Sequence, residues 1–156
     1  MNAFTEIERK FLISEIPRDL KSLRIHELQQ GYILLVNPQF ELRLRYDGAR
    51  YMQTFKTGEG QTRTEIEISI TREQFEVLWP FTKGCQLSKT RWECPYESWI
   101  IELDIYKSPH QGLITAEVEF DSEEEARRFV PPGWFGEEIT DNPRYRNRAL
   151  AGCTHV

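Results

Sequence analysis

Hydrophobic and polar residues alternate along much of the chain, which is typical of β-strands because successive strand side chains point to opposite faces. In FTEIERKFL, Glu6, Glu8 and Lys10 share one face, while Ile7 and Phe11 lie on the other. The same alternation predicts strands over residues 4–12, 25–36, 40–47, 50–57, 63–70, 86–94, 98–106 and 113–120. Turn-forming residues separate several of these strands, including an Asp-Gly pair that favours a hairpin.

Four stretches predict short helices: SEIPRDL from about Ser14, TREQFEVLW, DSEEEARRFV and NPRYRNRALAG. Thr71 and Gln74 have the spacing of a capping box, as do Ser122 and Glu125. No repeat or linker divides the chain, so residues 1–156 are predicted to form a single domain. Its predicted class is β-rich α+β, with an antiparallel sheet flanked by short helices. Eight strands suffice to close such a sheet into a barrel.

The charged residues on the polar faces of these strands are sorted by sign. In chain order the motifs are Glu-x-Glu, Arg-x-Arg, Glu-x-Glu, Lys-x-Arg, Glu-x-Asp and Glu-x-Glu. Like charges two positions apart on one face repel, so a plain surface would favour mixed signs. Two interpretations follow. The sheet is open with one solvated face, or it is a closed barrel whose charged side faces inward and whose apolar side the helices cover.

An inward charged face would place many basic and acidic side chains inside the barrel. The basic ones are Lys10, Arg43, Arg45, Lys56, Lys89 and Arg91, and the acidic ones are Glu6, Glu8, Glu65, Glu67, Glu102, Asp104, Glu117 and Glu119. Burying so many charges is unfavourable unless partners or ligands neutralise them. Basic side chains suit phosphate oxygens, and clustered carboxylates suit Mg²⁺ or Mn²⁺. A site with both kinds of group is suited to a metal–polyphosphate complex.

Composition and charge limit the other functions. The formal net charge of −5 argues against a nucleic-acid-binding protein. No apolar run approaches the roughly 20 residues of a membrane span, and MNAFTEIERK lacks the pattern of a secretion signal. Cys85, Cys94 and Cys153 have no paired metal spacing, so we expect free thiols and a cytoplasmic protein without membrane or nucleic-acid partners. A homodimer is compatible with the sequence, although no motif supports it.

EIERK is similar to the Glu-x-Glu-x-Lys signature of the CYTH superfamily, also called triphosphate tunnel metalloenzymes. The resemblance continues in order through QGY, ELRLR, TFKTGEG, RTEIEISI, KTRWE, IELDIY, AEVEF and DNPRYRN. It implies an eight-stranded antiparallel tunnel whose charged lining binds triphosphate and divalent metal. Within the family, the chain resembles the short bacterial inorganic triphosphatase type.

The resemblance also implies roles for single residues. The phosphate-binding positions of the family match Lys10, Arg43, Arg45, Lys56, Lys89 and Arg91. Its metal positions match Glu6, Glu8, Glu117 and Glu119. Its further acidic positions match Glu65, Glu67, Glu102 and Asp104. Tyr32 in QGY matches a tyrosine that is sometimes treated as a proton acceptor, and its other interpretation is a packed strand aromatic. A phenol of normal pKa is a poor base at neutral pH. Lys89 is therefore the alternative catalytic group, if cationic neighbours lower its pKa.

One segment departs from the family pattern. Relatives often have smaller polar residues after the tyrosine of DNPRYRN, where this chain has arginines. We interpret Arg144, Arg146 and Arg148 as solvated helix charges rather than as ligands of a substrate.

The expected reaction is hydrolysis of a triphosphate, above all inorganic tripolyphosphate, with two Mg²⁺ or Mn²⁺ ions as cofactors. One ion would neutralise phosphate oxygens and the other would activate water. The alternative is a nucleotide-acting CYTH enzyme: an adenylyl cyclase, or a nucleoside or thiamine triphosphatase. Such an enzyme needs stacking residues near a tunnel mouth; Trp92, Trp99 and Trp134 are the candidates, but Trp92 and Trp99 fall on the outer face by alternation. A third possibility, a non-catalytic polyphosphate-binding module, is disfavoured because binding an anion alone would not require so many carboxylates.

Overall fold

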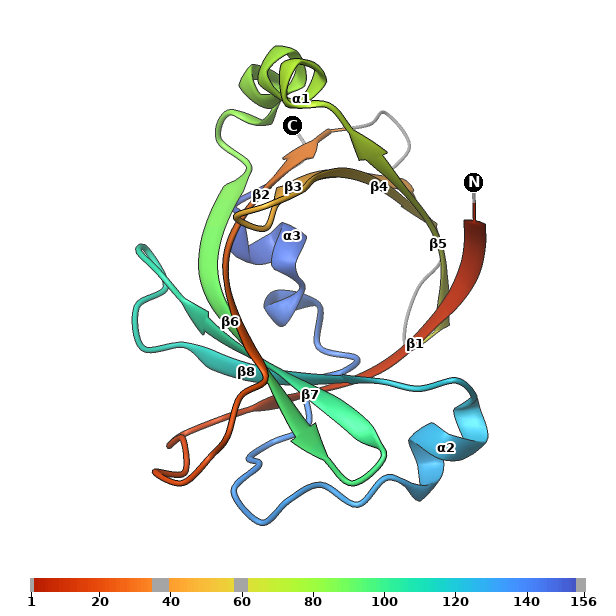
Figure 1. Ribbon diagram of the computed structural model, residues 1–156, viewed down its shortest axis with the longest axis vertical. Helices are drawn as coiled ribbons and strands as arrows, with labels where there is room; N and C mark the ends of the chain where they lie inside the picture. The colour runs from red at the N-terminus through yellow and green to blue at the C-terminus, as the bar shows by residue number, and fades with distance from the viewer. Residues whose placement is uncertain (1, 35–39, 58–61, 154–156) are drawn as a thin grey trace.

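The computed structural model describes residues 2–34, 40–57 and 62–153. Its strands are β1 (Asn2–Leu12), β2 (Arg24–Ile33), β3 (Phe40–Tyr46), β4 (Tyr51–Thr57), β5 (Thr62–Ile70), β6 (Gln86–Tyr96), β7 (Trp99–Tyr106) and β8 (Ile114–Glu119). Its helices are α1 (Arg72–Leu78), α2 (Glu123–Arg128), α3 (Asn147–Leu150) and the 3₁₀ helices η1 (Trp79–Thr82) and η2 (Pro143–Tyr145). The strands form a ring, with α1 and α2 outside it (Figure 1).

The ring is a closed antiparallel barrel with the strand order β1-β5-β4-β3-β2-β6-β7-β8, in which β8 pairs again with β1. The register sets Glu8 beside Glu119 and Lys10 beside Glu117 between β1 and β8. Because the side chains of each strand alternate, charged residues from every strand except β2 meet on the same side of the sheet. The predicted eight-stranded barrel of β-rich α+β class is confirmed.

The apolar core lies outside the ring of strands. Its main cluster joins outward-facing residues of β1, β6, β7 and β8 to α2 and the residues around it: Ile7, Phe11, Ile13, Cys94, Ile101, Leu103, Ala116, Val118, Phe120, Ala126 and Phe129. Figure 1 shows α2 beside these strands. Burying this face supplies the hydrophobic stabilisation of the domain, so the inner face is free to be polar. In the described part of the chain, no helix is long and apolar enough to cross a membrane.

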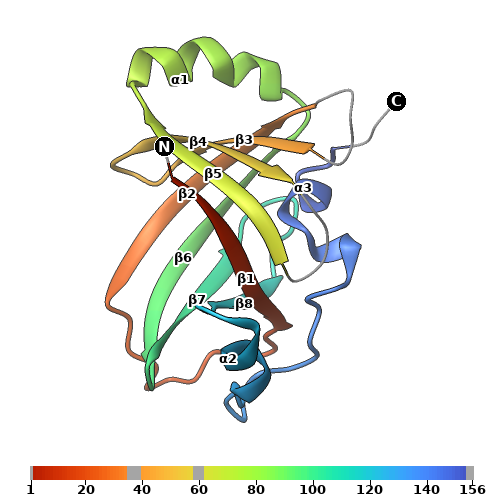
Figure 2. The same ribbon diagram turned by 90° about the vertical axis from the view of Figure 1, so that its right-hand side faces the viewer.

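Residues 136–140, which follow α2 in the chain, form a strap along the edge of β1 that β5 leaves unpaired. The amide of Ile139 donates to the carbonyl of Lys10 at 2.8 Å, and the amide of Lys10 donates to Thr140 Oγ1 at 3.0 Å. These bonds direct residues 139–151, here called the closing segment, across one end of the barrel. Figure 1 shows α3 through the ring of strands, and Figure 2 places it at the rim.

The predicted strands agree with the observed ones to within two residues, except at the end of the second. There β2 ends at Ile33, and residues 35 and 36 lie outside the described part. The helix predicted from Ser14 is wrong, because this stretch forms a turn in which the amide of Leu20 donates to the carbonyl of Pro17 at 3.1 Å. A proline in the middle of so short a stretch removes a backbone donor that a helix would need.

The capping predictions are confirmed in part. Thr71 Oγ1 accepts the Gln74 amide at 3.2 Å, and Gln74 Oε1 accepts the Thr71 amide at 2.8 Å, which completes a capping box. Ser122 Oγ accepts the Glu125 amide at 3.2 Å. The Glu125 carboxylate accepts the amide of Asp121 rather than that of Ser122, so the cap of α2 is one-sided.

Candidate active site

The barrel encloses a cavity of about 210 Å³ whose wall is highly charged. Its described lining holds the carboxylates of Glu6, Glu8, Glu41, Glu65, Glu67, Glu102, Glu117 and Glu119, and the basic groups of Lys10, Arg43, Arg45, Lys56, Arg91, Arg146 and Arg148. The charged faces of the strands therefore point inward, and the interpretation as an open sheet with a solvated face is wrong. The predicted site residues line this cavity, except Lys89 and Asp104, which are fully buried.

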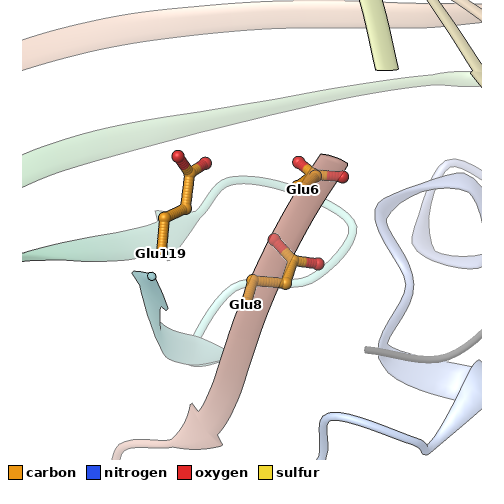
Figure 3. Close-up of side chains that lie close together, drawn as sticks. All are labelled: Glu6, Glu8 and Glu119. Atoms are coloured by element: carbon orange, nitrogen blue, oxygen red, sulfur yellow. The ribbon is translucent and has the colours of Figure 1, made fainter. Parts of the chain in front are cut away.

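Three of the predicted metal ligands come together in this wall. Glu6 and Glu8 extend from β1 and Glu119 from the end of β8, and one oxygen of each lies within 4.8 Å of the others (Figure 3). Burial raises the pKa of Glu119 to about 7, and the nearby carboxylates of Glu102, Glu6 and Glu8 add to this shift. A set of oxygen donors that repel one another fits a hard divalent cation, since the cation removes the repulsion.

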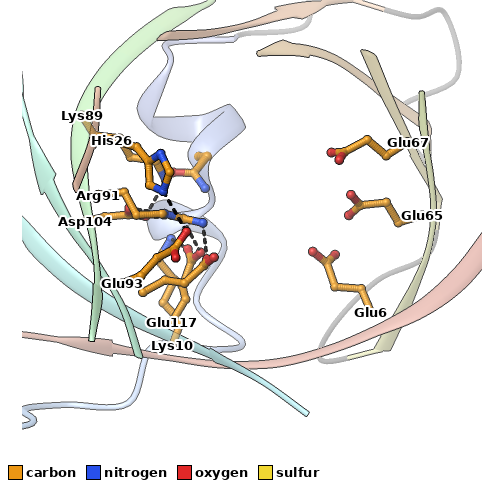
Figure 4. A network of polar contacts seen from close by, with 12 residues as sticks. Glu6, Lys10, His26, Glu65, Glu67, Lys89, Arg91, Glu93, Asp104 and Glu117 are labelled. Atoms are coloured by element: carbon orange, nitrogen blue, oxygen red, sulfur yellow. Dashed lines mark hydrogen bonds and ion pairs between the residues drawn. The ribbon is translucent and has the colours of Figure 1, made fainter. Parts of the chain in front are cut away.

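The wall made by β1, β4 and β5 holds Lys56 between two carboxylates. Its Nζ donates to both oxygens of Glu6, at 2.7 and 2.8 Å, and lies 2.6 Å from an oxygen of Glu65. Arg43 Nη2 lies 3.7 Å from the other Glu65 oxygen and 3.7 Å from Glu67. Burial raises the pKa of Glu65, although Lys56 and Arg43 oppose the shift. In Figure 4, Glu6, Glu65 and Glu67 point from this wall into the barrel.

The opposite wall is organised around Arg91. Its guanidinium donates to both oxygens of Asp104 at 2.7 Å each and to Glu117 at 3.0 Å (Figure 4). It also donates to Glu102. Lys10 Nζ lies 2.7 Å from the second oxygen of Glu117. Burial alone would raise the pKa of Glu117, but Lys10 and its other cationic neighbours hold it well below the usual range. Glu117, a predicted metal position, is thus paired with two cations of the protein itself.

Lys89 is fully buried beside this wall. Its Nζ donates to Asp104 at 2.5 Å and to Asn147 Oδ1 at 3.3 Å. The hydroxyl of Tyr106 donates to the same Asn147 oxygen at 2.7 Å. Burial lowers the pKa of Lys89 to about 8 against the attraction of Asp104. Cationic neighbours were the expected cause of a lowered pKa, and Arg91 does contribute, but burial of Lys89 is the larger effect.

Tyr32 lines the cavity from β2, and its ring is buried. Gln30 Nε2 donates to its hydroxyl oxygen at 2.7 Å. Burial raises the pKa of Tyr32, Glu41 adds to the shift, and Arg43 opposes it. The phenol is therefore protonated at neutral pH, and a role as proton acceptor would have to overcome this shift.

The closing segment contributes site residues that the sequence analysis did not assign. The stretch NPRYRNRALAG, predicted as one helix, is divided into η2 and α3 by the extended backbone of Arg146, with ψ of 136°. Arg146 and Arg148 line the cavity, and Arg148 is half-buried. For Arg148 the interpretation as a solvated helix charge is wrong, because the strap on β1 carries it over the end of the barrel and half-buries it. Arg146 is exposed, although it too lies in the cavity lining. Arg144 is exposed and is not in the lining.

Glu41 is a further lining residue that the sequence analysis missed. It shares the inward face of β3 with Arg43 and Arg45, so the strand alternation was a sufficient signal. Trp92, Trp99 and Trp134 pack against the outer apolar cluster. None of these three is in the cavity lining, where a nucleotide base would need a stacking surface.

Comparisons with known proteins agree with this architecture. The CYTH domain model matches residues 5–141. A curated relative from Nitrosomonas europaea, named inorganic triphosphatase, is 45% identical and covers 94% of this chain and 97% of its own. One from Acetivibrio thermocellus, with the same name, is 32% identical and covers 93% and 92%. The crystal structure of an inorganic triphosphatase has a TM-score of 0.70 and 43% identity over 96% of this chain and 95% of that one. The chain belongs to the CYTH domain family.

Proposed function

We propose that this protein hydrolyses inorganic tripolyphosphate to pyrophosphate and phosphate with the help of divalent metal ions. The observation that carries the proposal is a single cavity inside the closed barrel in which basic side chains and oxygen-donor carboxylates face each other. Two relatives of almost the same length, at 45% and 32% identity, are named inorganic triphosphatase. A cavity of about 210 Å³ also suits a compact substrate.

We infer that Glu6, Glu8 and Glu119 hold a divalent cation, Mg²⁺ or Mn²⁺, and that a second ion enters with the substrate. The all-oxygen donor set and the raised pKa of Glu119 support this assignment. When bound, the cation neutralises phosphate oxygens and makes water a better nucleophile. The other acidic positions have a different role in this proposal, since they lie outside this group of three and the protein's own basic side chains pair with them: Glu65, Glu67, Glu102, Asp104 and Glu117. They hold those basic groups in place around the substrate.

The phosphate ligands in this proposal are Lys10, Arg43, Arg45, Lys56 and Arg91, with Lys89 behind them. The Nε atoms of Arg43 and Arg45 are buried and have no hydrogen-bond partner among the described residues. Burial lowers the pKa of Arg45, and the cations Arg43 and Arg91 add to this shift. An anion beside Arg45 would relieve that repulsion and supply the missing acceptors. Arg146 and Arg148 would complete the site from the closing segment.

In the reaction, a water oxygen bonds to a terminal phosphorus, the bond from that phosphorus to the bridging oxygen breaks, and pyrophosphate leaves. The basic side chains hold the phosphate oxygens in position and offset the charge that develops on the bridging oxygen. Two groups are candidates for moving protons. Tyr32 remains a neutral phenol that can donate, whereas Lys89, with a pKa of about 8, can hold or release a proton near neutral pH. Because Lys89 is not in the lining, we assign it a positioning role through Asp104 and Asn147.

We also propose that the protein works in the cytoplasm. Cys85, Cys94 and Cys153 are free thiols in the described part of the chain, which supports a reducing compartment.

The proposal is tested by measuring phosphate, pyrophosphate and cyclic nucleotide released from tripolyphosphate, ATP and thiamine triphosphate, each with Mg²⁺ and with EDTA. We expect tripolyphosphate with Mg²⁺ to react fastest and to give phosphate and pyrophosphate in equal amounts. Faster turnover of ATP or thiamine triphosphate would assign the protein to the nucleotide or thiamine branch of the family. Tight binding of tripolyphosphate without turnover of any substrate would indicate a binding module.

A further inference from the structure

The QGY motif contains a buried glutamine that the proposed reaction does not use. Gln30 is fully buried on β2, and its side chain lies on the same face as that of Tyr32. Its Nε2 donates to the Tyr32 hydroxyl oxygen at 2.7 Å. Its Oε1 is buried and has no hydrogen-bond partner among the described residues. An incompletely bonded amide lowers stability, so its presence at this position calls for a role other than packing.

The backbone around Gln30 is held firmly in place. Between the two polar residues, Gly31 packs so closely against Thr82 of η1 that a Cβ at position 31 would lie 2.6 Å from Thr82 side-chain atoms. The amide of Tyr32 donates to the carbonyl of Cys85 at 3.0 Å. The glycine therefore lets β2 approach η1 on the outside, while Gln30 and Tyr32 project to the inside.

The neighbouring strand places two cations beside this pair. In the β2–β3 register, Gln30 lies beside Arg45 and Tyr32 lies beside Arg43. The Nε atoms of both arginines are buried without a partner among the described residues. This corner of the cavity thus combines unused N–H donors with a phenol. A phosphate group, which has several acceptor oxygens, can take hydrogen bonds from all of them.

The bond from Gln30 decides what the phenol can do. A hydroxyl oxygen that accepts an amide N–H has its own O–H directed elsewhere. With Gln30 Nε2 on one side, the proton of Tyr32 is left for an acceptor in the cavity that Tyr32 lines. We propose that Gln30 is a positioning residue that fixes the Tyr32 hydroxyl as a hydrogen-bond donor to a phosphate oxygen of the substrate. This inference rests on the proposed triphosphatase function. The raised pKa of Tyr32, caused first by burial, agrees with a protonated donor.

Substitutions at Gln30 and Tyr32 separate this role from packing. Gln30→Met removes the amide at nearly constant shape. Gln30→Glu introduces a carboxylate that accepts the phenol proton and turns the hydroxyl away from the cavity. Tyr32→Phe removes the hydroxyl itself. Gln29→Glu is the matched control, because Gln29 is the exposed neighbour on the outer face of β2 and receives the same change in charge. Melting curves verify that each variant is folded.

Two quantities are measured for each variant: kcat/KM for tripolyphosphate with Mg²⁺, and the Kd of tripolyphosphate in EDTA. We expect Gln30→Met, Gln30→Glu and Tyr32→Phe each to lower kcat/KM and to weaken binding by about tenfold, the effect of one hydrogen bond to a charged acceptor. Adding Gln30→Met to Tyr32→Phe should change neither quantity further, because Gln30 acts through the hydroxyl that is already absent. Gln29→Glu should behave like wild type.

The same data can overturn the inference. Wild-type values for Gln30→Met would show that the amide has no part in binding or catalysis. Equal losses with and without the Tyr32 hydroxyl would show that Gln30 acts independently of Tyr32. Neither of these two outcomes concerns hydrolysis by the wild type, so neither affects the proposed function. If the wild type binds tripolyphosphate without hydrolysing it, the proposed function fails and the Kd series alone decides the role of Gln30. Absence of binding by the wild type overturns both.

Discussion

Lys56 donates to both carboxylate oxygens of Glu6, at 2.7 and 2.8 Å, and so joins a proposed phosphate ligand to a proposed metal ligand in one buried ion pair. The barrel in this way neutralises part of its own interior without a ligand. A cation at Glu6 must compete with Lys56, and a phosphate at Lys56 must compete with Glu6. Each ligand therefore frees a group that binds the other, and the two should assist each other in binding.

Replacing Lys56 by methionine should affect the two ligands in opposite directions. Without the ammonium group, Glu6 is free for a cation, so we expect Mg²⁺ alone to bind about tenfold more tightly. Tripolyphosphate loses a cationic ligand, so its KM should rise by about tenfold or more. Calorimetry with Mg²⁺ and steady-state kinetics measure the two effects. Lys107→Met is the control, since Lys107 is exposed and pairs with Glu27 outside the cavity. Unchanged values for Lys56→Met in both assays would contradict the pairing.

The same variant should be less stable when metal is absent. Lys56→Met leaves Glu6 and Glu65 buried without the cation between them. Removing one member of a buried ion pair typically lowers the free energy of unfolding by about 3 kcal/mol. Urea denaturation in EDTA tests this value. We expect Mg²⁺ to restore part of the loss, and stability independent of Mg²⁺ would argue against a cation at Glu6.

Glu119→Gln should stabilise the metal-free protein in a pH-dependent way. The folded protein raises the pKa of Glu119 from 4.5 to about 7. The raised pKa means that ionising Glu119 costs more free energy in the folded protein than in the unfolded chain. The folded state is therefore destabilised progressively as the pH rises from 4.5, and the full effect is reached above pH 7. The variant should thus be more stable than wild type above pH 7 and equal to it near pH 4. Although its carboxylate is crowded by other charged side chains inside the barrel, Glu119 as a residue is exposed to solvent, so we discount the difference to about 1 kcal/mol. Urea denaturation in EDTA across this pH range measures it, with the exposed Glu124→Gln as control. A difference that does not vary with pH would contradict the repulsion among these carboxylates.

Tripolyphosphate with Mg²⁺ should raise the melting temperature, because only the folded barrel assembles the site. At 100 times Kd a ligand adds about 2.7 kcal/mol, which corresponds to roughly 5–10 °C for a chain of this length. Differential scanning calorimetry with and without the ligands measures the shift. Pyrophosphate of matched concentration serves as the control and should have a smaller effect, since it offers fewer oxygens to the cavity. No shift at saturating tripolyphosphate would rule out the site.

Arg148→Ala and Arg144→Ala test whether the closing segment supplies a substrate ligand. Arg148 lines the cavity, whereas Arg144 is exposed and is not in the lining, so the two variants remove the same charge from different places. We expect Arg148→Ala to raise KM for tripolyphosphate about tenfold, and Arg144→Ala to leave it unchanged. Steady-state kinetics at fixed ionic strength distinguish them. Equal KM values for both variants would show that Arg148, like Arg144, is a solvated surface charge that does not bind the substrate.

The residues inside the barrel could be predicted because strand alternation is a local signal. Glu6, Glu8 and Lys10 are two positions apart and so share one face of their strand. The sorting of charges by sign from strand to strand indicated a charged barrel interior rather than a solvated surface. Glu41 was accessible by the same rule. Which carboxylates gather was less predictable: Glu119 lies with Glu6 and Glu8, while Glu117 is paired with cations, and this depends on register and side-chain reach.

The closing segment could not be predicted because contacts distant in sequence position it. The backbone hydrogen bond from Ile139 to Lys10 joins opposite ends of the chain, and no residue pattern in NPRYRNRALAG predicts it. The same contacts explain Lys89: alternation placed it on the inner face, but Asp104 and Asn147 enclose it, and it is not in the lining. The local sequence around an exposed arginine of a short helix is like that around an arginine at the mouth of a barrel, so the sequence alone does not distinguish the two.

In the proposed function, carboxylates of the barrel hold the metal with which tripolyphosphate is hydrolysed. Phosphate release by wild type and Glu119→Gln, measured across a Mg²⁺ titration, tests this claim most directly. We predict that the wild-type rate is negligible in EDTA and rises to a plateau with Mg²⁺. We predict that Glu119→Gln is folded, binds tripolyphosphate, and is slower by about 100-fold at every Mg²⁺ concentration, as expected for a damaged metal site. A Glu119→Gln variant that hydrolyses tripolyphosphate like wild type throughout the titration would contradict the claim.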